Sequence, residues 1–297
     1  MIAYAQLNPR RPGFRLGRAL AYYAQRVVTP TPLRRALTGG IALVVRSRHG
    51  AGPKRPTRQR ELGELRGRGI AMLAPLFSED ALRSVQDYFR GAPVTLPGGR
   101  QASLAEVPAG TRSAAYDLQT IVDCPHLLEA VNDPELLSLA AAYLGCKPTL
   151  SSLGVRWSFP NAVGREDVQA WHRDCDDWRT IKVFTYLTDV CPTSGPHAYV
   201  RGSHRTRATL RNAQFTTDGL ADRFGEDSIL SVIGPSGTSF VGDMAGIHRG
   251  VVPKREPRLI LQAQFSVLPI QCFDYNPVRR RCPPALDAYT NRLIVRG

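Results

Sequence analysis

The chain lacks several features that mark secreted, metal-cluster or membrane-spanning proteins. Its six cysteines are scattered without a CxxC pair, and its start shows no basic stretch followed by an apolar run and a small-residue cleavage site. The longest apolar run, around residues 39–45, falls well short of the ~20 residues needed to cross a bilayer. We therefore expect reduced thiols, a cytoplasmic location and no membrane-spanning helix.

Acidic residues are scarce in the first quarter of the chain. Residues 1–68 contain fifteen of the 39 Lys and Arg residues but only two of the 25 Asp and Glu residues, Glu61 and Glu64. The net charge of +14 therefore belongs almost entirely to this segment. Proline and glycine interrupt it repeatedly, which predicts a basic N-terminal extension, residues 1–60, of short helices joined by breaks rather than a packed domain.

Within this extension, residues 15–28 have the pattern of an amphipathic helix. The apolar face consists of Leu16, Leu20, Tyr23 and Val27, and the opposite face carries Arg15, Arg18 and Arg26. Such a helix is suited to an anionic membrane surface, which would place the protein at the inner face of a membrane. Docking on the body of the protein, with the arginines in water, remains open. Nucleic-acid binding is less favoured because no reader motif accompanies the charge.

The remaining residues, 61–297, are predicted to form one catalytic domain, because a chain of 297 residues that is 43% hydrophobic can bury one large core. Residues 61–146 are expected to be helical, with Ser78 capping one helix and Gly145 ending another. Residues 147–269 then carry short runs of β-forming residues, and residues 270–297 form a tail. The strand candidates are residues 150–159, 181–187, 198–200, 229–233, 238–241 and 259–268. We predict a mainly β (α+β) jelly roll, cupin-like, with flanking helices.

A possible metal site follows the first long strand candidate. His172 and Asp174 are two residues apart, so in an extended segment their side chains project to one face and can share a metal. His248 is a third candidate, in the turn after the strand at 238–241. Two imidazoles and one carboxylate leave one face of an octahedral metal open, which suits non-haem Fe(II) that must bind a co-substrate and O2. Asp243 is the competing carboxylate. We prefer Asp174 as the ligand because it lies only two residues from His172.

Arg258 opens the last strand candidate, and alternation places it on the same face as Gln262 and Gln264. A buried guanidinium needs an anionic partner, and its fork matches a carboxylate. A small dicarboxylate that chelated iron at one end would meet Arg258 at the other.

These residues resemble the phytanoyl-CoA dioxygenase family of Fe(II)- and 2-oxoglutarate-dependent oxygenases. The resemblance rests on residues 171–174, 182–190, 194–197, 202–204, 242–248 and Arg258. It covers residues 61–269, while residues 1–60 have no recognised counterpart. It implies a double-stranded β-helix with His172, Asp174 and His248 as iron ligands and Arg258 as the anchor for 2-oxoglutarate. Lys182 is a secondary candidate to face the co-substrate or substrate. His197 and His204 are expected to be packing, surface or structural residues.

The resemblance also implies a reaction. With Fe(II), 2-oxoglutarate and O2, the enzyme would hydroxylate a small-molecule, lipid or saccharide substrate and release succinate and CO2. Relatives that halogenate replace the ligand carboxylate with a small residue, so an intact Asp174 favours hydroxylation or a related oxidation. Two hypotheses from other classes stay open: a catalytically inactive jelly-roll binding module, and a membrane- or nucleic-acid-binding protein that acts through its basic N-terminal arm.

Overall fold

A computed structural model of the chain describes residues 7–11, 13–51, 58–160, 170–206, 215–280 and 285–296. Residues 1–6, 12 and 52–57 of the predicted extension and residues 281–284 and 297 of the predicted tail lie outside the described residues. Within the described ranges no helix is long and apolar enough to cross a membrane. The cysteines described as free are Cys124, Cys146, Cys175, Cys191 and Cys272.

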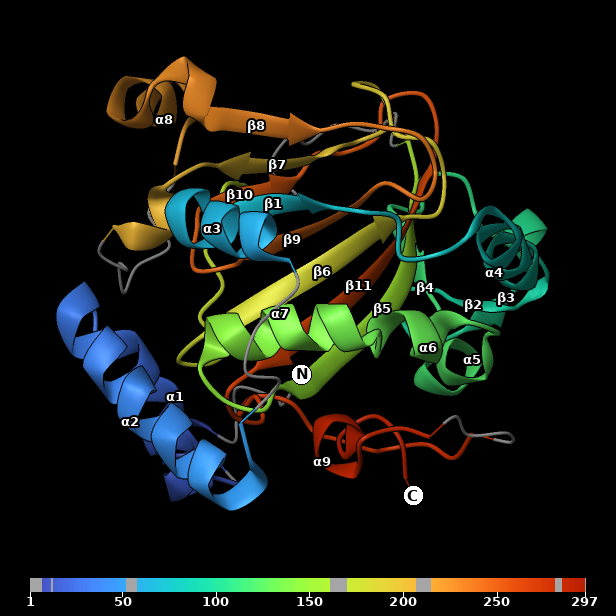
Figure 1. Cartoon of the computed structure of the whole chain (residues 1–297). Coiled ribbons are helices and arrows are strands. Elements are labelled where there is room, and N and C mark those ends of the chain that lie inside the picture. Colours follow the sequence, from blue (N-terminus) through green and yellow to red (C-terminus); the bar gives the residue numbers. More distant parts are fainter. Residues whose placement is uncertain are drawn as a thin grey trace.

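Two antiparallel sheets form the centre of the molecule (Figure 1). The larger has the order β1-β9-β6-β11-β5-β4-β2-β3 and the smaller has the order β10-β7-β8. The strands are β1 (Ile70–Leu73), β2 (Val94–Thr95), β3 (Gln101–Ala102), β4 (Ser113–Ala115), β5 (Thr149–Ser158), β6 (Thr180–Tyr186), β7 (His197–Val200), β8 (Ile229–Val232), β9 (Ser239–Asp243), β10 (His248–Gly250) and β11 (Arg258–Ser266). This two-sheet sandwich with flanking helices confirms the predicted double-stranded β-helix.

Strand β11 lies in the middle of the larger sheet, between β5 and β6. Alternate residues of a strand face opposite sides, so β11 contributes to two separate layers. Leu259, Leu261 and Phe265 join the core beneath the helices. Ile260 joins a second cluster with Phe184 and other residues between the two sheets. The interior of the sandwich therefore receives the Arg258 face of β11, as the alternation predicted.

Helices cover the outer side of the larger sheet. They are α3 (Gln59–Arg68), α4 (Glu79–Gly91), α5 (Leu118–Asp123), α6 (Leu127–Val131), α7 (Pro134–Leu144) and α9 (Ala288–Asn291). Helix α8 (Thr217–Phe224) instead lies beside the smaller sheet (Figure 1), where Leu220 packs with Ala198 and Val200 of β7. Helix α7 runs across the sheet (Figure 1), where Leu136, Leu139 and Leu144 are buried in the core. The Ser78 hydroxyl accepts from the Ala81 N–H at the start of α4, and Gly145 ends α7 with a φ of 85°. Both predicted caps are confirmed.

The segment 61–146 differs from its prediction as a helical region. It contributes the short strands β1 to β4 to the larger sheet, and β1 pairs with β9 through Ile70 and Gly242. His248, predicted in a turn, lies in the three-residue strand β10. Runs of two to four residues are too short to show a two-residue alternation, and neighbouring strands rather than local sequence make them extended.

Two helices, α1 (Leu16–Val27) and α2 (Thr31–His49), form a hairpin against the sandwich, called here the N-terminal hairpin (Figure 1). The helix predicted for residues 15–28 is confirmed. The hairpin is fastened by polar groups: Arg18 pairs with Asp274 at 3.0 Å, and Arg34 donates to the Asp177 carbonyl at 2.8 Å. Docking on the body, one of the two alternatives left open, is what the structure shows, but not with all the arginines in water: Arg18 contacts the body, while Leu16 and Leu20 are exposed.

Candidate active site

Backbone pairing brings the two candidate histidines together, with the His248 side chain buried and the His172 side chain 41% exposed. The His172 N–H donates to the His248 carbonyl at 3.0 Å, and the His248 N–H donates back at 2.9 Å. Asp174 continues this pairing by donating its N–H to the Met244 carbonyl at 2.8 Å. The segment before β6 is thus held in register with the chain from β9 to β10, independently of any ligand.

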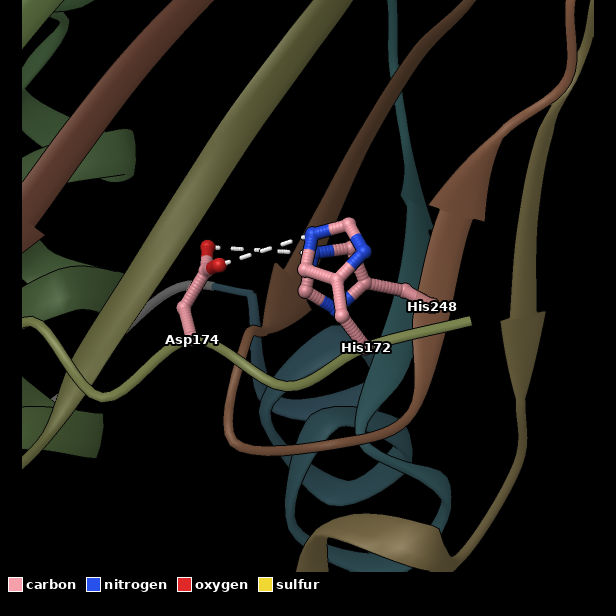
Figure 2. A group of neighbouring side chains, drawn as sticks. All are labelled: His172, Asp174 and His248. Carbon is pink, nitrogen blue, oxygen red and sulfur yellow. Dashed lines mark ion pairs between the residues drawn. The ribbon is translucent and has the colours of Figure 1, made fainter. Parts of the chain in front are cut away.

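The three side chains converge as Figure 2 shows. The Asp174 carboxylate lies 3.6 Å from His172 Nε2 and 3.7 Å from His248 Nε2. One donor atom from each residue fits within 4.8 Å of the others, a spacing suited to a single metal ion. Arg173, between the two ligand candidates, points elsewhere and donates to the Ser203 carbonyl at 2.9 Å and the Thr206 hydroxyl at 2.7 Å.

Hydrogen bonds set the histidine tautomers that a metal requires. His172 Nδ1 lies 2.9 Å from the Ala170 carbonyl, and His248 Nδ1 lies 3.0 Å from the Gly246 carbonyl. A carbonyl can only accept, so each Nδ1 carries the proton and each Nε2 presents a lone pair toward Asp174. Burial lowers the pKa of His248 to about 4, against the opposing charge of Asp174. His248 is therefore neutral at physiological pH and ready to ligate.

Asp174 is ionised for an equally local reason. Its burial raises the pKa, but Lys182 and His248 more than offset this and lower the pKa of Asp174 to about 2. Lys182 Nζ lies 2.5 Å from the Asp174 carboxylate. The donor set, two imidazoles and one carboxylate, fits divalent iron.

The competing carboxylate, Asp243, is engaged elsewhere. It accepts from the Tyr143 hydroxyl at 2.5 Å and from the Ala245 N–H at 2.9 Å. Among the residues that the structure describes, it is Asp174 that groups with the two histidines. The preference for Asp174 stays a prediction about metal binding, and this geometry supports it.

Arg258 lies at the start of β11 and is almost fully buried, at 1% exposure. It donates to the Gly195 carbonyl and to the Ser158 hydroxyl, 3.4 Å away, while its Nε has no partner among the described residues. Burial lowers its pKa to about 10, which leaves it charged. Within the described ranges no carboxylate pairs with this buried cation, so Arg258 is suited to bind an anion.

One interior residue was not singled out from the sequence as part of the site. His197, on β7, is buried with its ring 4.8 Å from that of Phe184 and 5.6 Å from that of His248. It is a packing residue, as expected, but its Nε2 lacks a partner in the described part of the chain. No local pattern marks it, because its position depends on the pairing of β7 with β10. His204 instead faces the Arg66 carbonyl at 3.1 Å and stays outside the metal group.

A cleft of about 450 Å³ lies between the N-terminal hairpin and the sandwich. Four arginines and three aspartates line it, so its charges are nearly balanced: Arg34, Arg35, Arg66, Arg179, Asp174, Asp177 and Asp243. Of the three metal-ligand candidates, Asp174 is the one that lines this cleft. Since His172, His248 and Arg258 are not among its lining residues, this cleft is distinct from the sandwich interior.

A double-stranded β-helix holding two imidazoles and a carboxylate defines a class, the non-haem iron oxygenases. Residues 66–249, more than half of the chain, match the family model described as phytanoyl-CoA dioxygenase (PhyH). The chain belongs to this family of Fe(II)- and 2-oxoglutarate-dependent dioxygenases, with iron and 2-oxoglutarate as its cofactors. A comparison with curated proteins finds no match.

Solved structures show the same fold. EctD from S. alaskensis in complex with 2-oxoglutarate and 5-hydroxyectoine is 22% identical over 72% of this chain and 77% of that one, with a TM-score of 0.53. EctD with bound Fe is 20% identical over 82% and 88%, with a TM-score of 0.52. HygX from Streptomyces hygroscopicus with nickel and 2-oxoglutarate is 17% identical over 74% and 90%, with a TM-score of 0.50.

Proposed function

We propose that the enzyme hydroxylates a small-molecule, lipid or saccharide substrate, converting 2-oxoglutarate and O2 to succinate and CO2. One oxygen atom enters the substrate C–H bond and the other enters succinate. The observation that carries this proposal is the preformed His172, Asp174 and His248 cluster, accompanied by the buried Arg258, which pairs with no carboxylate in the described part of the chain. EctD, solved with 2-oxoglutarate and 5-hydroxyectoine, supports a small hydroxylated product.

In this proposal each residue has a defined task. His172, Asp174 and His248 hold Fe(II) by one face, and the bound iron supplies O2 activation. Arg258 binds the distal carboxylate of 2-oxoglutarate through charge-assisted hydrogen bonds. Lys182 keeps Asp174 ionised through its 2.5 Å contact. A direct contact between Lys182 and the co-substrate stays a prediction.

Aromatic side chains would protect the reacting groups. Phe184 and Phe240 stack with ring centroids 5.0 Å apart, and both belong to the cluster between the sheets. An apolar wall next to the ligands excludes water and strengthens the electrostatic contacts within the site.

The proposal is tested by anaerobic titration with Fe(II) and 2-oxoglutarate, followed by exposure to O2 and measurement of succinate. Wild type should give a weak metal-to-ligand absorption band and succinate, and His172→Ala should lose both. Arg258→Ala should need at least about tenfold more 2-oxoglutarate, because it loses the charged partner of the distal carboxylate. His49→Ala is the matched control, since His49 is exposed at the end of α2.

Equal absorption and succinate yield in wild type and His172→Ala would refute the ligand assignment. Absence of Fe(II)-dependent succinate in wild type, across candidate substrates, would instead favour the inactive binding module. Hydroxylation, as opposed to another oxidation, is tested by incorporation of ¹⁸O from labelled O2 into the product.

The division of the chain is part of the same proposal. Residues 61–297 would form the catalytic domain and residues 1–60 the extension, so deleting the extension should leave uncoupled succinate formation intact. Loss of all turnover on deletion would show that the extension completes the active site. The extension contains basic residues but no Asp or Glu, which favours an anionic substrate or surface as partner.

A further inference from the structure

Exposed apolar side chains are concentrated in one part of the described chain, the N-terminal hairpin. Ten large hydrophobic residues are exposed in the described ranges, and eight of them belong to α1 and α2. They are Leu16, Leu20, Tyr23, Val27, Leu33, Leu37, Leu43 and Val44. The remaining two, Met72 and Ile233, lie elsewhere and stand apart in sequence. The hairpin therefore carries most of the apolar surface that the fold leaves in water.

In α1 the exposed residues form one stripe. Leu16, Leu20 and Val27 follow the i, i+4, i+11 spacing that places side chains on one helical face, and each is more than 60% exposed. The buried residues of α1, Ala19 and Gln25, lie outside this stripe, and Gln25 is on the opposite face. Gln25 reaches the Asp177 carboxylate at 3.5 Å. Helix α1 thus turns small and polar groups toward the protein and its leucines outward.

Helix α2 also exposes an apolar stripe, although it buries apolar residues on its other side. Leu33, Leu37 and Val44 have the same spacing and are exposed. Thr38, Ala42 and Val45 are buried. An amphipathic helix of a globular protein normally buries its apolar stripe. Two consecutive helices that each leave an apolar stripe exposed form a surface suited to a partner.

The positive charge around this surface indicates which kind of partner it binds. Residues 1–60 contain no Asp or Glu, and the exposed arginines of the hairpin include Arg15, Arg35, Arg46 and Arg48. A second copy of the chain meeting this face would bring like charges together. An anionic bilayer offers what both features require, an apolar layer beneath a negatively charged headgroup region.

We propose that the N-terminal hairpin is a monotopic membrane anchor that lies in the interface of an anionic bilayer. The leucines of α1 and α2 enter the acyl boundary, Tyr23 lies at headgroup level, and the exposed arginines contact lipid phosphates. The polar side of the hairpin keeps the enzyme attached, through Arg18 to Asp274 and Arg34 to the Asp177 carbonyl. The proposal concerns attachment alone and is independent of iron, 2-oxoglutarate and turnover.

The test is co-sedimentation of the full-length protein with vesicles of phosphatidylcholine alone or mixed with phosphatidylglycerol, at low and high salt. Wild type should bind the anionic vesicles and lose affinity at high salt, since screening weakens the arginine contacts. The double variant Leu20→Glu/Leu37→Glu should bind at least about tenfold more weakly, because it places charges in the apolar layer. Ile233→Glu is the matched control, because Ile233 is an exposed apolar residue outside the hairpin. This variant should bind the vesicles as wild type does.

Near-ultraviolet circular dichroism and succinate formation establish that each variant is folded and active, which separates a failed anchor from a failed enzyme. The proposal is overturned if wild type does not bind anionic vesicles, or if the leucine variant binds them as well as wild type. It is equally overturned if light scattering shows a dimer that the leucine variant converts to a monomer, since the face would then join two copies of the chain.

Discussion

His172 and His248 form a hydrogen-bonded antiparallel pair that exchanges two backbone hydrogen bonds of 3.0 and 2.9 Å. Directly opposed residues of such a pair project to the same side, which explains why their rings lie 4.4 Å apart, centroid to centroid. Asp174 reaches the same side two residues later. The backbone register of one short segment against β10 therefore creates the candidate metal site.

Replacing each candidate carboxylate in turn tells the two apart. We expect Asp174→Asn to lower Fe(II) affinity by at least about a hundredfold, because even outer contacts of metal ligands are worth about 10–100-fold. Asp243→Asn should leave Fe(II) affinity within a few fold, since its carboxylate contacts Tyr143 and Ala245. Anaerobic Fe(II) titration measures both. Equal losses in the two variants would contradict the assignment of Asp174.

Arg173 is predicted to position the ligands without touching the metal. Its guanidinium joins the ligand segment to the Ser203 carbonyl and the Thr206 hydroxyl. Arg173→Met keeps the stem of the side chain but loses these bonds, so we expect Fe(II) affinity to fall about tenfold and the melting temperature to drop. Arg83→Met is the control, because Arg83 is exposed and its ion pair with Asp80 lies at the surface. Unchanged metal affinity in Arg173→Met would show that the segment holds its register without this anchor.

Arg258→Lys separates charge from geometry in co-substrate binding. Lysine keeps the positive charge but lacks the planar fork that binds a carboxylate through two parallel hydrogen bonds. We expect the KM for 2-oxoglutarate to rise at least about tenfold while Fe(II) affinity stays unchanged. Steady-state succinate formation and a separate Fe(II) titration measure the two effects. A lysine variant with wild-type KM would mean that the distal carboxylate binds elsewhere.

Much of the site could be predicted because its signals are local. The two-residue spacing of His172 and Asp174 and the alternation that begins at Arg258 each follow from strand geometry. Caps at Ser78 and Gly145 are equally local. These predictions required no knowledge of which segments pair.

Features that depend on pairing could not be predicted in the same way. His197 faces the interior because β7 lies beside β10, and β1 is extended because β9 is next to it. The hairpin adds a different limit: a helical wheel separates the faces of α1 but does not say which one meets the protein. The face that carries Arg18 and Gln25 meets the protein, because both side chains make polar contacts with it, and Leu16 and Leu20 are therefore exposed.

The stability of the protein should depend on pH through Asp177, which is buried beneath the N-terminal hairpin. Burial raises the pKa of this carboxyl from 3.8 to about 6, although it accepts N–H groups such as that of Leu268 at 2.9 Å. The folded state therefore holds a proton that the unfolded state has lost between about pH 4 and pH 6. This stabilisation is complete below about pH 4 and is lost as the pH rises through about 6.

Asp177→Asn cannot ionise, so the free energy of unfolding of this variant, relative to wild type, should increase between about pH 4 and pH 7. A shift of about two pKa units corresponds to an increase of roughly 3 kcal/mol. Urea denaturation of both proteins across this range measures the difference. Asp80→Asn is the control, since the exposed Asp80 side chain should give a difference that does not change with pH. A flat difference for Asp177→Asn as well would mean that the backbone N–H groups around Asp177 fully offset the cost of burying its charge.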